Sequence, residues 1–84
     1  MAQYLVEAYT SKRGGDDLGS LVARARKAAA AMRRDGIDVH YLRPILVPED
    51  ETCFHLFEAP SAEVVAEISK RAELAYDRIA EAVE

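Results

Sequence analysis

The chain begins with a strand-like pattern and then changes to a helical one. Apolar and polar residues nearly alternate over residues 3–9, which predicts a β-strand. After a glycine-containing loop, apolar residues recur at steps of three and four, which predicts an amphipathic helix ending near Asp35. Asp16 or Asp17 suits the N-cap of this helix, and Gly36 suits the position just after its last turn.

Two strands joined by a short turn follow the first helix. Residues 37–47 and 52–59 are rich in β-branched and aromatic residues and alternate in polarity, with an acidic turn at residues 48–51 between them. Pro44 cannot donate a ladder hydrogen bond, so the strand of residues 37–47 is expected at a sheet edge or with a bulge.

A second helix and an ambiguous tail complete the chain. Pro60 ends the preceding strand, and Ser61 is expected to cap a helix over residues 62–74. The tail, residues 78–83, fits either a continued helix, which its local pattern slightly favours, or a short strand. The order β-α-β-β-α, with or without a final strand, is that of the ferredoxin-like α+β fold, in which an antiparallel sheet carries two helices on one face.

Composition narrows the class of protein. The 84 residues suit a single domain, 1–84, and half of them are apolar and 31% charged, as in ordinary globular chains. The net charge of -4 disfavours nucleic acid as a partner. No apolar run approaches the ~20 residues of a membrane span, and no signal-peptide pattern is present. A single cysteine agrees with a reducing compartment, so we expect a cytoplasmic protein.

The hairpin of residues 37–59 determines which side chains lie on the open face of the sheet. If Val47 pairs with Thr52, alternation divides the hairpin into two sets. The larger and more apolar set is assigned to the helices: Val39, Tyr41, Arg43, Ile45, Val47, Phe54 and Leu56. The set assigned to the open face is His40, Leu42, Leu46, Cys53, His55 and Phe57. Leu42, Leu46 and Phe57 would form an exposed apolar patch, which predicts a homodimer packed sheet against sheet.

The same open face carries candidate metal ligands. Cys53 and His55 are about 7 Å apart along one strand face. Glu7, on the neighbouring first strand, would be a third donor, and a thiolate, imidazole and carboxylate set suits zinc, and nickel less well. His40 lies ~13 Å along the sheet from His55, so the two would share an ion only across a dimer.

These residues also have structural interpretations. Cys53 also fits a small buried hydrophobe, and His55 fits a hydrogen-bonded interface side chain. For such a pair these structural roles are commoner than metal binding. A Cys53–His55 nucleophile and base would lack an evident oxyanion hole or orienting third group. The basic residues of the first helix favour a solvated helix face over an anion site.

Three segments resemble a small bacterial family of nickel-binding proteins: YLVE at the start, VPEDETCFHLFEAPS in the middle and YDRI near the end. The resemblance extends over nearly the whole chain and implies a ferredoxin-like fold, a homodimer, nickel binding and a final strand in residues 78–83. Glu7 matches the glutamate that the family has on its first strand. Arg43 and Ile68 occupy positions at which the resemblance implies histidine ligands.

We therefore expect a cytoplasmic homodimer that binds nickel or another divalent transition metal through the open sheet face, rather than an enzyme. Two alternatives remain open. One is a dimeric α/β-barrel type small-molecule-binding protein or enzyme, with a cavity between sheet and helices for an organic molecule, and the other is a non-catalytic interaction module. Metal titration separates the first class from the other two.

Overall fold

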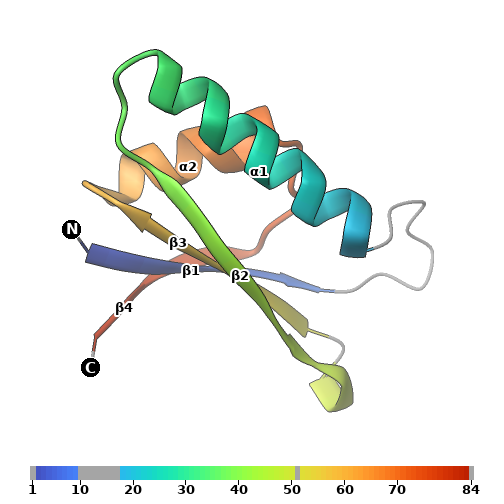
Figure 1. The fold of residues 1–84 in the computed structure, drawn as a ribbon. Helices are drawn as coiled ribbons and strands as arrows, with labels where there is room; N and C mark the ends of the chain where they lie inside the picture. Colours follow the sequence, from blue (N-terminus) through green and yellow to red (C-terminus); the bar gives the residue numbers. More distant parts are fainter. Residues whose placement is uncertain (1, 10–17, 51, 84) are drawn as a thin grey trace.

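The computed structural model describes residues 2–9, 18–50 and 52–83 (Figure 1). The elements are β1 (Ala2–Tyr9), α1 (Leu18–Arg34), β2 (His40–Val47), β3 (Thr52–Ala59), α2 (Ala62–Arg71) and β4 (Arg78–Ala82). A single turn of 3-10 helix, Pro48–Asp50, joins β2 to β3. The ferredoxin-like β-α-β-β-α-β arrangement is thus confirmed. The predicted N-cap of α1, Asp16 or Asp17, lies outside the described residues.

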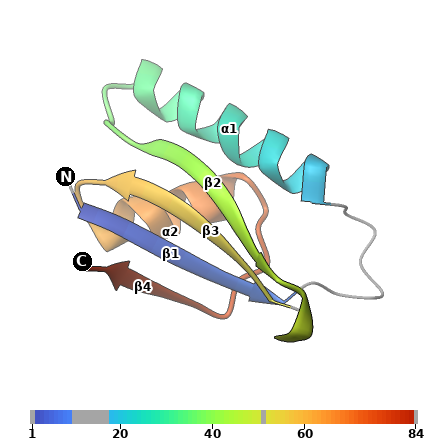
Figure 2. The same ribbon diagram turned by 60° about the horizontal axis from the view of Figure 1, so that its bottom comes forward.

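The four strands form one antiparallel sheet in the order β2-β3-β1-β4. Both helices lie on the same face of this sheet, with α1 above β2 and α2 behind β3 and β1 (Figures 1 and 2). The opposite face carries no helix. The chain therefore has one covered face, which holds the core, and one open face.

The tail forms the edge strand β4, so the helix that its local pattern slightly favours is wrong and the strand implied by the resemblance is correct. Ile79 pairs with Val6 of β1 and packs against the core from the covered face. Arg78 and Glu81 are exposed, so the segment has too few buried positions for its local pattern to distinguish a helix from a strand. The stabilising partner of β4 is β1, which is more than 70 residues away in sequence.

The predicted hairpin register is correct from Val47–Thr52 to Arg43–Leu56 and then shifts. A bulge between Tyr41 and Arg43 places Tyr41, instead of Leu42, opposite Phe57. β2 is therefore both an edge strand and a bulged one, as Pro44 led us to expect.

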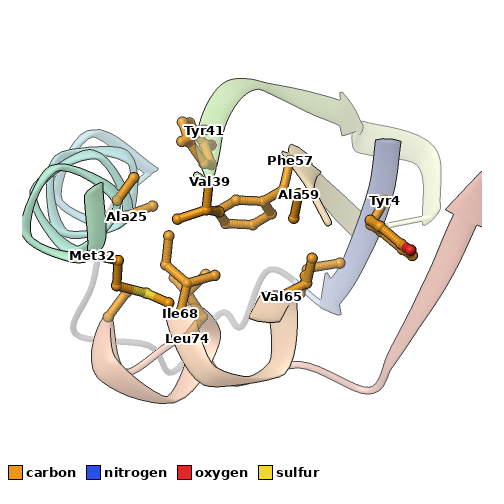
Figure 3. Packing of buried hydrophobic residues seen from close by; sticks show 13 residues of the cluster. Tyr4, Ala25, Met32, Val39, Tyr41, Phe57, Ala59, Val65, Ile68 and Leu74 are labelled. Carbon is orange, nitrogen blue, oxygen red and sulfur yellow. The ribbon is translucent and has the colours of Figure 1, made fainter. Parts of the chain in front are cut away.

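The prediction that Cys53, His55 and Phe57 lie on the open face is wrong: the helices cover this side of the hairpin, and the bulge adds Tyr41 to it. Phe57 is fully buried in the core between sheet and helices, where its ring meets the edge of Tyr41 with centroids 5.1 Å apart (Figure 3). Since alternate residues of β3 share a face, Cys53 and His55 lie on the covered face with Phe57, whereas Phe54 and Leu56 lie on the open face. The buried cluster comprises Tyr4, Val6, Ala25, Ala29, Met32, Val39, Tyr41, Phe57, Ala59, Val65, Ile68, Ala72 and Leu74.

Both helices end with the same backbone motif but with different residues at its left-handed position. After α1, Gly36 has φ 90°, its N–H donates to Arg33 O, and Ile37 N–H donates to Met32 O. After α2, Glu73 has φ 57°, and the N–H of Leu74 donates to Ser69 O at 2.9 Å. These are Schellman caps, which favour glycine at the left-handed position. Glu73 therefore bears a backbone strain that Gly36 avoids.

Replacing Glu73 with glycine is expected to stabilise the protein by about 0.5–1 kcal/mol, because relief of left-handed strain exceeds the entropy that glycine loses. Gly36→Ala is the matched opposite change. No atom lies within 4 Å of the added methyl group, so its cost of about 1 kcal/mol would be backbone strain alone. Urea denaturation measures both, and equal destabilisation by the two substitutions would contradict this interpretation.

Candidate functional site

The four predicted metal ligands do not form one site. Two lie on the covered face of the sheet, one lies on the open face and one begins the edge strand β2. Cys53 and His55 both lie on the covered face of β3 and are buried. Glu7 lies opposite Phe54 and so on the open face, where its Oε1 accepts a hydrogen bond of 2.7 Å from Arg78 Nε. His40 begins β2, with Nε2 2.8 Å from a carboxylate oxygen of Asp38. Only Cys53 and His55 of the four come together.

His55 is a fully buried imidazole with one partnered nitrogen. It lies on the inner strand β3, between Val6 of β1 and Pro44 of β2, and its Nδ1 is 2.8 Å from the hydroxyl of Tyr41. Its Nε2 is buried and has no hydrogen-bond partner among the described residues. Burial lowers the pKa of His55, because the charged form would lose its hydration. The ring is therefore neutral at physiological pH, with one N–H donor and one bare lone pair.

Tyr41 connects this histidine to the core and to α1. Its ring contacts both His55 and Phe57, and the guanidinium carbon of Arg26 lies 5.3 Å from the ring centroid. Burial raises the pKa of Tyr41 to about 12; Cys53 adds to this rise and Arg26 opposes it. The phenol is thus neutral and free to donate to Nδ1 or to accept from it. Sequence reasoning missed the Tyr41–His55 pair, because without the bulge these residues fall on opposite faces.

Cys53 is a buried thiol, 2% exposed, whose Sγ makes a weak contact of 3.8 Å with the carbonyl oxygen of Phe54. Burial raises the pKa of the Cys53 thiol, while the backbone N–H of Ile45 acts in the opposite direction. A protonated, covered thiol is a poor nucleophile, so this environment argues against covalent catalysis. The same thiol remains a donor for a metal ion that can displace its proton.

The sulfur and nitrogen donors do not by themselves complete a conventional metal centre. Across residues 2–9, 18–50 and 52–83, no three His, Cys, Asp or Glu side chains gather closely enough to hold an ion. What the covered face offers is a thiol, an imidazole with a free nitrogen and a neutral phenol. This Cys53–His55–Tyr41 group is hereafter called the interior cluster.

Two arginines of α1, which were expected on a solvated helix face, instead donate hydrogen bonds to backbone carbonyls of other segments. Arg24 donates to the carbonyl oxygens of Ala72 and Glu73 at the end of α2, at 2.8 and 3.1 Å. Arg33 donates to Val39 O at 2.8 Å and so fixes the entry to β2. One arginine thus contacts the end of α2 and the other the segment before β2. The spacing of the arginines along α1 could not predict these tertiary contacts.

The open face carries an apolar patch of different composition from the one predicted. Phe57 is in the core, and Leu46 pairs with Cys53 and therefore shares the covered face. Leu42 lies within the bulge. The observed patch, hereafter the open-face patch, consists of Leu5, Ile45, Val47, Phe54, Leu56 and Ala80.

The fold and the interior cluster define a small ferredoxin-like protein with a sulfur and nitrogen donor pair on the covered face of its sheet. The chain belongs to the family of nickel responsive proteins described as SCO4226-like, whose family model matches residues 12–82. It is similar to the crystal structure of SCO4226 from Streptomyces coelicolor A3(2), with 28% identity, a TM-score of 0.69 and coverage of 99% of this chain and 98% of that one. No curated protein matches the chain.

The described part of the chain contains no helix that is long and apolar enough to cross a membrane.

His55 should make the metal-free protein less stable in acid. In the unfolded chain its pKa is close to the ordinary value near 6.5, whereas burial lowers it in the folded state. The stability from keeping His55 neutral is therefore complete above pH 6.5 and is lost as the pH falls toward the folded-state pKa. Urea denaturation of the wild type in chelator, between pH 7.5 and 5, should show this decline.

His55→Gln removes the titrating group and should flatten the part of the profile that begins near pH 6.5. His40→Gln is the matched control, because that histidine is partly exposed beside Asp38. An unchanged profile in His55→Gln would show that another group causes the acid sensitivity.

Proposed function

We propose that the protein is a homodimeric, cytoplasmic, metal-responsive binding protein, rather than an enzyme, and that it takes up nickel or another divalent transition metal with His55 as the anchoring ligand. The observation that supports this proposal most directly is the fully buried imidazole whose Nε2 has no hydrogen-bond partner among the described residues. The name of the family, nickel responsive, supports the choice of ion.

The environment of His55 resembles that of a metal-ligating histidine. Such histidines usually hold their second ring nitrogen against an outer partner, which fixes the tautomer and the orientation of the ring. Tyr41 occupies that position at Nδ1, 2.8 Å away. A buried polar atom without a partner costs about 1–3 kcal/mol, and a metal bound at Nε2 would offset this cost.

The donor set is incomplete for a divalent ion. Zinc is usually four-coordinate, and nickel commonly takes square-planar or larger donor sets. Arg43 and Ile68, at the two positions where the resemblance implies histidines, carry no suitable donor, and Ile68 is fully buried in the core. Glu7 is already paired with Arg78 on the other face. The proposal therefore depends on His55, with Cys53 as its neighbour, and not on the open face.

Calorimetric titration of metal-free protein with nickel, zinc, cobalt and copper(II) salts tests the metal-binding class. We expect binding at micromolar concentrations with at least one of these ions. His55→Gln should weaken it by about 100-fold or more, and Tyr41→Phe by 10–100-fold, as for an outer-shell partner. His40→Gln should have no effect. Binding to none of these ions, or full affinity in His55→Gln, would refute the assignment.

The homodimer is proposed to form through the open-face patch. Phe54 and Leu56 of the inner strand β3 form the apolar centre of the patch, and Leu56 is its most covered member. Ile45 lies beside Phe54 on the edge strand β2 and is 37% exposed. Charged side chains flank this apolar centre, with Arg43 at the β2 edge and the Glu7–Arg78 pair near the β4 edge. A symmetric partner would bury the patch and leave the charges at the rim, which is the usual arrangement of an interface.

Ile45 and Leu46 provide a matched test because they are adjacent, exposed at 37% and 49%, and on opposite faces. Ile45→Glu should convert the dimer to a monomer, because it places a charge within the patch directly beside Phe54. Leu46→Glu should leave the dimer intact. Gel filtration with light scattering distinguishes the outcomes; a wild-type monomer, or dissociation by Leu46→Glu alone, would exclude this interface.

A further inference from the structure

We propose that Cys53 and His55 form a binding site for monovalent copper, Cu(I), on the covered face of β3. The inference deepens the proposed function, since it rests on metal binding at His55, but it assigns a different ion to that site. It follows from the number of donors on the covered face, their softness and the charges around them.

The number and type of donors suit Cu(I). Cys53 and His55 leave the same face of β3 with one residue between them, so their Cα atoms are about 7 Å apart. This separation allows a thiolate and an imidazole to approach one ion from two sides. Cu(I) has a filled d shell and accepts two-coordinate binding, and thiolate ligands favour it. The described residues offer this pair and no third His, Cys, Asp or Glu beside it.

Both donor atoms are available for a metal ion. His55 Nε2 has no hydrogen-bond partner among the described residues, and the S–H of Cys53 makes a weak contact of 3.8 Å with Phe54 O. The backbone N–H of Ile45, which also faces the sulfur, favours its thiolate form. Tyr41 would continue to hold Nδ1, with the Nδ1 proton donated to the phenol oxygen and the Nε2 lone pair left for the metal. The tautomer that ligation requires is thus compatible with the observed hydrogen bond.

The balance of charge selects a monovalent ion. One thiolate, one neutral imidazole and Cu(I) sum to zero charge, which is the state that a buried site tolerates best. A divalent ion with the same donors would leave one positive charge in the interior. Tyr41 is a neutral phenol, Arg26 beside it is a cation, and Glu7 is on the opposite face, so none of these groups compensates that charge.

Binding is a simple exchange of a proton for a metal ion. The S–H bond of Cys53 breaks and its proton leaves to solvent, while bonds form from Sγ and from His55 Nε2 to copper. The oxidation state of copper and the electron count of the protein are unchanged. One proton should therefore be released for each Cu(I) bound.

The test is an anaerobic titration of the metal-free protein with Cu(I) supplied as its acetonitrile complex, in competition with the coloured chelator bicinchoninate. We expect one Cu(I) per chain, bound at least about 100-fold more tightly than nickel, since a buried uncompensated charge carries a large penalty. Cys53→Ser and His55→Gln should each weaken binding by about 100-fold or more, whereas His40→Gln should bind as the wild type does.

X-ray absorption of the copper-loaded wild type provides a readout that does not depend on the folding of variants. One sulfur and one nitrogen neighbour would support the site, and a sulfur-free copper environment would overturn it. Cu(I) affinity unchanged in Cys53→Ser would also overturn it. If one of the divalent ions binds through His55 and Cu(I) does not bind, the inference fails and the proposed function stands; if neither Cu(I) nor any of the divalent ions binds, both fail.

Discussion

One extra residue in β2 determines which side chains of the hairpin are covered by the helices. The bulge around Leu42 reverses the phase of the strand, so Tyr41 joins Phe57 in the core while Arg43 and Ile45 turn to the open face. Without it, the tyrosine hydroxyl would not reach the ring of His55. The core contact, the partner of the buried histidine and the apolar centre of the open face all follow from this single irregularity in the ladder.

Much of the architecture could be predicted because it is encoded locally. Helix α1, the hairpin turn and the Ser61 cap, which accepts from Val64 N–H, appear where the pattern placed them. The strand β4 could not be inferred locally, since it depends on pairing with β1. The faces of β3 were assigned wrongly for a similar reason: alternation gives two sets of side chains, but a bulge in the partner strand determines how sets on neighbouring strands combine.

In the candidate site too, some features can be predicted from neighbouring residues and others depend on the tertiary structure. The neighbouring positions of Cys53 and His55 on one strand face are visible in the sequence. Their burial, and the hydrogen bond from His55 to Tyr41, depend on the tertiary structure. Glu7 was placed correctly on β1 but faces away from the cluster and pairs with Arg78, a residue of the tail that local pattern slightly favoured as helix. The burial of the His55 ring, with Nδ1 held by Tyr41 and no partner for Nε2 among the described residues, distinguishes the interior cluster from ordinary core packing better than the spacing of the ligands does.

The two edges of the sheet differ in how they would meet another chain. At the β2 edge, Pro44 lacks an N–H and the neighbouring bulge disturbs the ladder, so an incoming strand would find an irregular row of donors and acceptors. β4, at the other edge, is short but contains no proline among its residues Arg78–Ala82. An added strand would therefore find a more regular row of donors and acceptors along β4 than along β2.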